Sequence, residues 1–125
     1  MNSIKESVNN LVNICHSASK NAGWWTAEDG SNLIDNPLIT PIKLALIVTE
    51  ISEAIEGDRS NLMDDKLPHR PMTEVELADA AIRIFDLAGA KGYDLGGAIE
   101  EKMAFNLVRP DHKQESRVKT NGKKY

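Results

Sequence analysis

The sequence has little of what stabilises secreted proteins or carries a chain into a membrane. Its 125 residues include one cysteine, Cys15, which excludes an internal disulfide and favours a reducing compartment. The longest apolar run covers residues 44–48, far short of the roughly 20 residues that cross a bilayer. The polar N-terminus also lacks the apolar core of a secretion signal. We therefore expect a cytoplasmic protein with no membrane partner.

A large excess of positive charge is also lacking. The net charge of −4 argues against a nucleic acid polymer as the main partner. Residues 109–125 contain six lysines or arginines against two acids, a charge of +4, so residues 1–108 carry −8. The length fits one core, and we expect a single helical domain over residues 1–108 followed by a basic tail over residues 109–125.

Aromatic residues are scarce, with two each of tryptophan, tyrosine and phenylalanine, and the two tryptophans are adjacent. Trp24 and Trp25 open a predicted loop that runs to residue 37. They can pack beneath this loop or form a stacking surface for a planar ring. His16 and Asn21 lie late in the preceding predicted helix, and together the four residues form a candidate base pocket. For His16, an exposed polar side chain is the alternative.

The apolar residues recur with the helical period, and no strand-like alternation is present. Helices are predicted over residues 3–22, 40–56, 73–91 and 94–108. Residues suited to begin or end a helix stand at these boundaries: Ser3 with Glu6, Gly23, Thr40, Gly57, Thr73, Gly92 and Asp94. Mostly short connections predict an all-α bundle. The second helix has so wide an apolar arc that we expect it to be the most buried.

Two pairs of acids, each at i, i+3, are the main candidates for chemistry. Glu50 and Glu53 share a helix face that begins apolar, so we expect them to face a cleft rather than solvent. Glu76 and Asp79 form the second pair, although Glu76 also suits a capping box with Thr73. The polar stripe of that helix, taken alone, is typical of an ordinary solvated face: Glu76, Asp79, Arg83 and Asp86.

Four carboxylates without a Cys/His cluster favour Mg²⁺ or Mn²⁺ over zinc. Lys102, Asn106 and Arg109 form a donor-rich stripe on the fourth helix that suits phosphate or the edge of a base. The polar loop over residues 58–72 is either solvated or closes on a phosphate. Together these residues indicate metal-assisted attack of water on a polyphosphate, with Glu53 orienting or deprotonating the water.

Three separated motifs stand in order: Glu50-x-x-Glu53, Glu76-Leu77-Ala78-Asp79 and Lys102-x-x-x-Asn106-x-x-Arg109-Pro110. This pattern, over roughly residues 43–109, resembles the MazG-like all-α nucleoside triphosphate pyrophosphohydrolases, and most of all their small phage-encoded members. Many relatives have a further glutamate where Thr49 stands, which leaves the number of bound metal ions open.

The resemblance implies a four-helix bundle that assembles as a dimer or a dimer of dimers, with sites at the subunit interface. It implies hydrolysis of a nucleoside triphosphate to the monophosphate and pyrophosphate, by attack at the α-phosphorus. The Mg²⁺ ligands would be Glu50, Glu53, Glu76 and Asp79, of which Glu50 and Glu53 are also the candidate catalytic residues. Lys102 and Asn106 match nucleotide-binding positions, and Arg109 is a candidate phosphate contact. Arg83 and Asp86 lie outside the minimal motif, and we assign them supporting roles beside the ligands.

The substrate remains open at this point. A purine deoxynucleotide such as dGTP is our expectation, with a role in adjusting the nucleotide pool. Phosphoribosyl-ATP is an alternative substrate within the same superfamily. A helical interaction module without catalytic activity is the alternative outside it.

Overall fold

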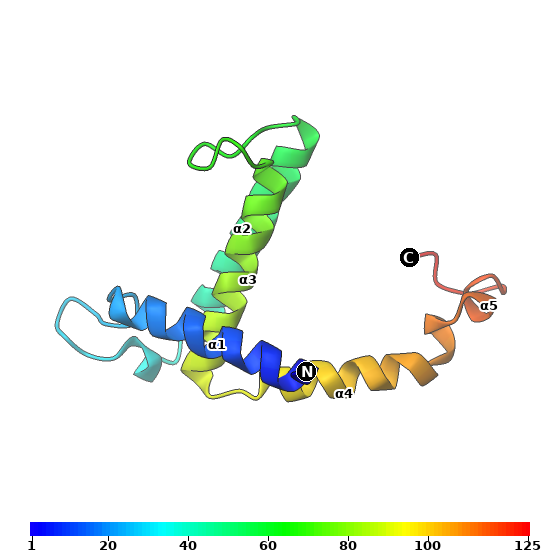
Figure 1. The fold of residues 1–125 in the computed structure, drawn as a ribbon, viewed down its shortest axis with the longest axis horizontal. Coiled ribbons are helices and arrows are strands. Elements are labelled where there is room, and N and C mark those ends of the chain that lie inside the picture. Colours follow the sequence, from blue (N-terminus) through cyan, green and yellow to red (C-terminus); the bar gives the residue numbers. More distant parts are fainter. The chain divides into compact units, whose positions relative to one another are not determined.

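The structure, a computed structural model, describes all residues from Met1 to Tyr125, and it is entirely helical (Figure 1). Its elements in order are α1 (Ile4–Asn21), the 3-10 helix η1 (Leu33–Asp35), α2 (Ile39–Arg59), α3 (Met72–Lys91), α4 (Leu95–Val108), the 3-10 helix η2 (Pro110–His112) and α5 (Gln114–Arg117). Only isolated β-bridges occur outside the helices, which confirms the all-α class. None of the helices has the length and apolar character needed to cross a membrane.

The chain forms two compact units. The larger unit comprises residues 10–93, and the smaller one joins residues 1–9 to residues 94–125. Helix α1 contributes its first residues to the smaller unit and the rest to the larger. The division into a domain over residues 1–108 and a tail over residues 109–125 stays a prediction.

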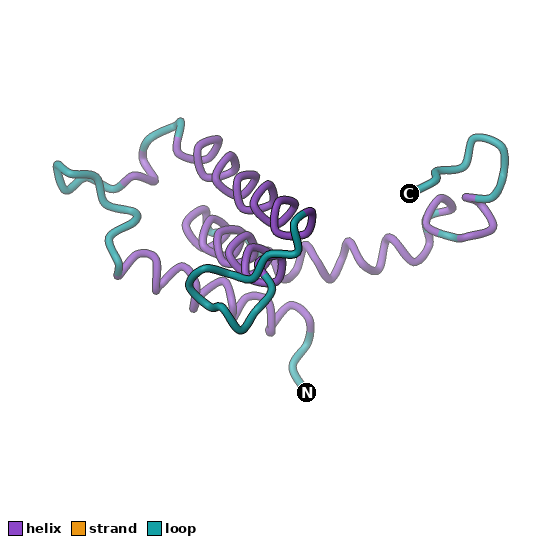
Figure 2. The backbone as a smooth tube through the Cα atoms, turned by 90° about the horizontal axis from the view of Figure 1, so that it is seen from above, coloured by secondary structure: helices purple, strands orange, loops and turns teal.

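Helices α2 and α3 lie side by side and run antiparallel in the larger unit (Figures 1 and 2). At Gly57, an added Cβ would lie 2.9 Å from Cβ and Cγ of Met72, so only glycine permits this approach. The prediction that Gly57 ends the helix is therefore wrong, because α2 continues to Arg59. Thr73 is not a cap either, since its hydroxyl donates to the Ala54 carbonyl across the helix pair at 3.3 Å.

The start of α2 also differs from the prediction. The helix begins at Ile39 after Leu38, which makes no side-chain capping bond, so Thr40 lies inside the first turn rather than at the cap. Pro41 is tolerated there because the first N–H groups of a helix have no partner within the helix.

The core of the larger unit is small and lies where the loop after α1 meets α2 and α3. Trp25, Ile39 and Leu87 form its centre. Many apolar side chains of α2 remain outside it, with Leu44, Val48 and Ile55 at least half exposed. In the single chain, the prediction that this helix is the most buried is therefore wrong.

Helix ends that depend only on neighbouring residues agree with the sequence. Ser3 and Glu6 exchange reciprocal hydrogen bonds of 3.0 and 3.1 Å, which confirms the predicted capping box. Gly23 and Gly92 have positive φ angles of 89° and 69° where α1 and α3 end. Asp94 accepts from the Gly97 amide at 3.0 Å and caps α4 as predicted.

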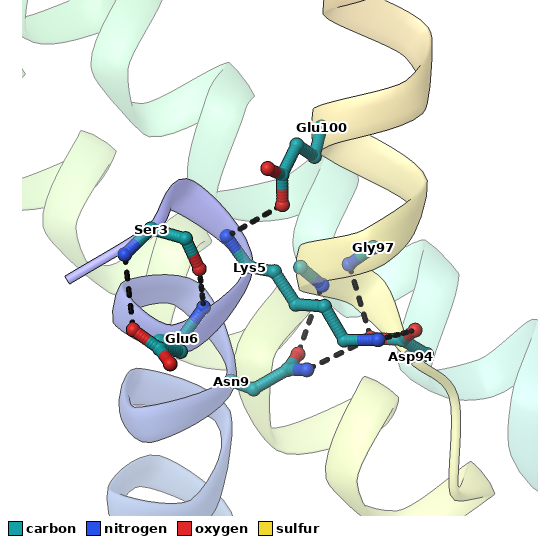
Figure 3. Close-up of polar contacts among 8 residues, drawn as sticks. Ser3, Lys5, Glu6, Asn9, Asp94, Gly97 and Glu100 are labelled. Carbon is teal, nitrogen blue, oxygen red and sulfur yellow. Dashed lines mark hydrogen bonds and ion pairs between the residues drawn. The ribbon is translucent and has the colours of Figure 1, made fainter.

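In the smaller unit, the beginning of α1 is joined to the start of α4 by polar contacts (Figure 3). The Asn9 side chain donates to Asp94 at 2.8 Å and accepts from the Gly96 amide at 2.9 Å. Lys5 forms an ion pair of 3.1 Å with Asp94. A Cβ at Gly96 would clash with the Lys5 carbonyl oxygen, so this crossing requires a residue without a side chain.

Candidate functional site

Three of the predicted acids meet between α2 and α3. One carboxylate oxygen from each of Glu50, Glu76 and Asp79 lies within 4.8 Å of the others. Glu50 and Glu76 are buried, at 9% and 7% exposure, so neither belongs to a solvated face. The third acid of the α3 stripe, Asp86, is buried as well. The solvated-face interpretation of this stripe is therefore wrong.

Burial and mutual repulsion change the acidity of this group. Burial raises the pKa of Glu76 to about 8, and the neighbouring carboxylates of Glu50 and Glu53 add to the shift. Burial also raises the pKa of Asp79, with Glu50 contributing, while Arg83 opposes the change. Three acids at this spacing thus destabilise one another unless positive charge is supplied.

Arg83 supplies part of that charge. Its Nε donates to Glu50 Oε1 at 2.8 Å across the helix pair. The Glu50 side chain is 11% exposed, whereas that of Arg83 is 40% exposed. The spacing of Arg83 from Asp79 placed it on the acidic face of the predicted helix, but its partner on α2 was not predicted.

The acids line a pocket of about 670 Å³, here called the acidic pocket. Six carboxylates contribute to its wall: Glu50, Glu53, Asp64, Asp65, Glu76 and Asp79. Glu53 is exposed and lies outside the group of three, but it belongs to the same pocket. Lys66 is the one basic residue in the lining.

The loop between α2 and α3 forms one side of the acidic pocket, and Asp64 organises it. Its carboxylate accepts from the amides of Lys66 and Leu67 at 3.0 and 2.8 Å, while its own amide donates to Arg70. Asp64 is 6% exposed, so this loop acid is not solvated. No periodic pattern in the sequence indicates this arrangement, because these bonds are local turn contacts in an irregular segment.

A second pocket of about 770 Å³ adjoins the first, here called the tryptophan pocket. It lies between α1, α2 and α3, and its apolar wall consists of Ile14, Ala18, Ala22, Trp24, Leu46 and Ile82. Its polar lining consists of Cys15, Ser19, Lys43, Arg83 and Asp86. Glu50 and Asp79 line both pockets, so the acid group stands where an acidic space meets a largely apolar one.

The four residues of the candidate base pocket have different positions. Trp24 is 68% exposed and lines the tryptophan pocket. Trp25 is a core residue at 4% exposure, and its Nε1 donates to Asp86 at 2.9 Å. His16 lies edge-on to Trp25 and also contacts Asp86, through Nδ1 at 2.8 Å. Asn21 is exposed and is not part of the lining.

The candidate phosphate donors lie in the smaller unit. Arg109 donates to both carboxylate oxygens of Asp111, at 2.9 and 2.7 Å, and to the Asn106 side chain at 3.3 Å. Lys123 reaches the same carboxylate at 2.9 Å. Lys102 lies 4.8 Å from the ring centre of Phe105. Arg109 and Asn106 are thus brought together, and the tail supplies an acid that occupies the Arg109 guanidinium.

Lys43 is a pocket residue that the sequence did not indicate. Its Nζ lies 4.6 Å from the centre of the Trp25 ring, and the side chain lines the tryptophan pocket. The signal was available, because Lys43 precedes Glu50 by seven residues, which is two helical turns along one face.

Comparison of the chain with protein-family models, with curated proteins and with solved structures found no match.

Proposed function

We propose that this chain is a metal-dependent nucleoside triphosphate pyrophosphohydrolase of the MazG-like kind. The observation that carries the proposal is the meeting of Glu50, Glu76 and Asp79 at the junction of two pockets. A nucleoside triphosphate has an anionic chain at one end and a flat, weakly polar base at the other. An acidic pocket able to take a cation, beside an apolar pocket with an exposed tryptophan, matches both ends.

The donor set suits a hard divalent cation, Mg²⁺ or Mn²⁺. All donors are carboxylate oxygens, and the group contains neither a cysteine nor a histidine. One arginine does not balance three acids. A bound cation would therefore relieve the repulsion among these carboxylates in the folded chain. Glu50, Glu76 and Asp79 would hold the ion, with Glu53 as a further ligand from the same pocket. When bound, the ion would lower the pKa of a coordinated water and offset charge on the phosphates.

Glu53 is the residue of this chain that would take the proton. It is exposed within the acidic pocket and shares the α2 face with Glu50, so its carboxylate is available to solvent water. The oxygen of that water forms the new bond to the α-phosphorus, and the bond from this phosphorus to the bridging oxygen breaks. Pyrophosphate leaves with that oxygen, and the water proton passes to Glu53.

Lys102, Asn106 and Arg109 are proposed to bind the nucleotide, as the resemblance implies. The bonds of Arg109 to Asp111 would have to be exchanged for bonds to phosphate, which a doubly charged phosphate group favours. The proposed role is adjustment of the nucleotide pool, with a purine deoxynucleotide such as dGTP as the expected substrate.

We also propose that the chain assembles into a dimer or a dimer of dimers whose core is a four-helix bundle. Helix α2 supports this, because apolar side chains along it are exposed in the single chain: Ile42, Leu44, Val48, Ile51 and Ile55. Leu77 and Ile84 add apolar surface on α3. Exposed apolar side chains that recur along a helix are typical of a surface that another chain covers.

The test is a panel of the eight common ribo- and deoxynucleoside triphosphates with Mg²⁺, with Mn²⁺ and with a chelator, resolving pyrophosphate from orthophosphate. We expect nucleoside monophosphate and pyrophosphate from at least one nucleotide, and none with the chelator. Orthophosphate with the diphosphate would contradict attack at the α-phosphorus. Turnover of phosphoribosyl-ATP alone would favour the biosynthetic alternative, and no turnover with any of these would favour an interaction module.

Glu53→Gln separates catalysis from folding. We expect it to lower kcat by about 10²–10⁴-fold, the range for loss of a general base. The thermal midpoint should stay equal or rise, because one acid is removed from the pocket. Glu56→Gln is the matched control, since Glu56 is exposed one turn further along α2 and pairs with Arg59. Activity that survives Glu53→Gln, together with a lower midpoint, would overturn the assignment of Glu53.

A further inference from the structure

We propose that Asp86 is a specificity-determining residue, whose free carboxylate oxygen selects a base carrying an exocyclic amino group. This inference rests on the proposed function, because it places the base of the nucleotide in the tryptophan pocket. It adds a chemical class of base that the motifs do not specify: adenine, guanine or cytosine in preference to uracil, thymine or hypoxanthine.

The first support is that Asp86 is held in one orientation. Its Oδ1 accepts from Trp25 Nε1 at 2.9 Å and lies 2.8 Å from His16 Nδ1. A carboxylate only accepts, so Nδ1 of His16 carries the hydrogen of this bond. Trp25 is 4% exposed and belongs to the core, so the indole cannot turn away. Two donors on one oxygen thus fix which end of the carboxylate is free.

The second support is that the other oxygen, Oδ2, is open. The hydrogen bonds of the Asp86 side chain all involve Oδ1. Every fully buried side-chain nitrogen or oxygen in the structure has a hydrogen-bond partner. Oδ2 has none, so it must be exposed to solvent, although Asp86 as a whole is only 9% exposed. Because Asp86 lines the tryptophan pocket, Oδ2 is the unused carboxylate acceptor that we assign to the base.

The third support is the arrangement of the pocket around that oxygen. Glu50 and Asp79 line the side shared with the acidic pocket, where the phosphates would be held. Trp24 supplies an exposed indole against which a base can stack, and Ile82 is part of the apolar wall. With the phosphates held at the shared acids and the base stacked on Trp24, the edge of the base would lie among the remaining polar groups of the lining. Asp86 is the one acid among these groups.

The chemistry of that edge decides the preference. An amino group donates a hydrogen bond to Oδ2, and a hydrogen bond to a charged acceptor is among the stronger ones in proteins. A carbonyl oxygen at the same place presents lone pairs to the carboxylate and leaves both groups unpaired, which disfavours binding. Bases in which a carbonyl group replaces the amino group are therefore the sharpest probes.

The experiment measures binding of deoxynucleoside monophosphates to the full chain by quenching of tryptophan fluorescence, in two matched pairs. Deoxycytidine is compared with deoxyuridine monophosphate, and deoxyadenosine with deoxyinosine monophosphate. We expect the amino member to bind at least about ten-fold more tightly in one or both pairs, as a charged hydrogen bond implies. Equal affinity within both pairs, or preference for the carbonyl member, would overturn the inference.

Asp86→Asn tests direct contact. Trp25 and His16 both donate to the Oδ1 position, so the amide oxygen of asparagine should lie there and its NH₂ should face the pocket. The preference is then expected to shrink at least about ten-fold or to reverse, because a donor now meets the amino group. Asp58→Asn is the control, since Asp58 is exposed and lines neither pocket.

If Asp86 had a purely structural role, Asp86→Asn would weaken the binding of all four nucleotides by the same factor. The affinity ratios within the pairs would then stay unchanged, which would contradict the inference. If Asp86→Asn fails to fold, the ratios of the unaltered protein still decide. The two proposals fail separately. Pyrophosphate release without a preference within the pairs would refute the role of Asp86 alone, whereas amino-selective binding without any turnover would refute the hydrolase alone.

Discussion

Arg83 and Glu50 face each other across the α2–α3 pair, with Nε of the arginine 2.8 Å from Oε1 of the glutamate. Glu50 is the one member of the group of three acids with an ion pair in the structure. Burying a carboxylate without a partner disfavours folding far more than burying a paired one. Arg83 therefore gives Glu50 a positively charged partner beside Glu76 and Asp79.

Replacing Arg83 with glutamine should lower the free energy of unfolding of the metal-free protein by about 1–3 kcal/mol, the range for a charged group left without its partner. Mg²⁺ should raise the thermal midpoint of this variant more than that of the unaltered protein, because the cation would supply the missing charge. Arg59→Gln is the control: it removes an exposed pair with Glu56, which is expected to contribute less than about 1 kcal/mol. An equal loss of unfolding free energy in both variants would show that the Arg83–Glu50 pair stabilises the fold no more than the exposed pair does.

Glu76 should make the metal-free protein less stable as the pH rises. Its pKa is about 8 in the folded chain and 4.5 without the fold, so the folded state retains a proton that the unfolded state releases. Stability should therefore fall from pH 4.5 to about 8 and change no further from this group above that range. In a chelator, thermal midpoints across this range should fall for the unaltered protein and less for Glu76→Gln.

At the upper end of this range, Glu76→Gln should melt about 4 °C or more above the unaltered protein, which corresponds to roughly 1 kcal/mol in a chain of this size. Glu74→Gln, an exposed acid of the same helix, serves as the control. Parallel curves for all three proteins would show that Glu76 titrates normally.

Asp111 should compete with phosphate for Arg109. Its two oxygens hold the guanidinium, and Lys123 of the tail joins them. Asp111→Ala should tighten binding of inorganic pyrophosphate a few-fold, measured by titration calorimetry at low salt, because the donors of Arg109 become free. Glu115→Ala removes the same charge from exposed α5 without touching Arg109. If both variants gain the same affinity for pyrophosphate, the change in net charge rather than the contact between Asp111 and Arg109 is responsible for the gain.

Asp94 should make the junction of α1 and α4 sensitive to strong acid. Bonds from Asn9 and from the Gly97 amide, with Lys5 nearby, lower its pKa from 3.8 to about 2. An acid whose pKa is lower in the folded state stabilises that state above pH 3.8, and this contribution is lost as the pH falls towards 2. Asp94→Asn retains an acceptor for the cap but cannot titrate.

The amide of Gly97 reports on this junction, because it donates to Asp94. Its hydrogen-exchange protection should be greater in the unaltered protein than in Asp94→Asn at about pH 5, and the difference should vanish near pH 2. A difference that is independent of pH would mean that the charge of Asp94 has no role.

The parts of the fold that followed from the sequence are those with local causes. Ser3 and Glu6 cap α1 with each other, and Asp94 caps α4, because each bond spans three residues. The predictions for Gly57 and Thr73 are wrong, since both residues are suited to helix ends yet serve the contact between α2 and α3. A cap residue is ambiguous whenever a neighbouring helix offers it a different partner.

The sequence by itself determined which acids share a face, because the helical period places Glu76 beside Asp79 whatever the surroundings. Only the tertiary structure decided that Glu50 joins them while Glu53 remains at the pocket wall. It alone brought Trp25 to Asp86, 61 residues away. Local patterns act over a turn of helix, whereas burial, pKa shifts and pockets arise from segments distant in the chain, and those contacts are what turn a polar stripe into a candidate site.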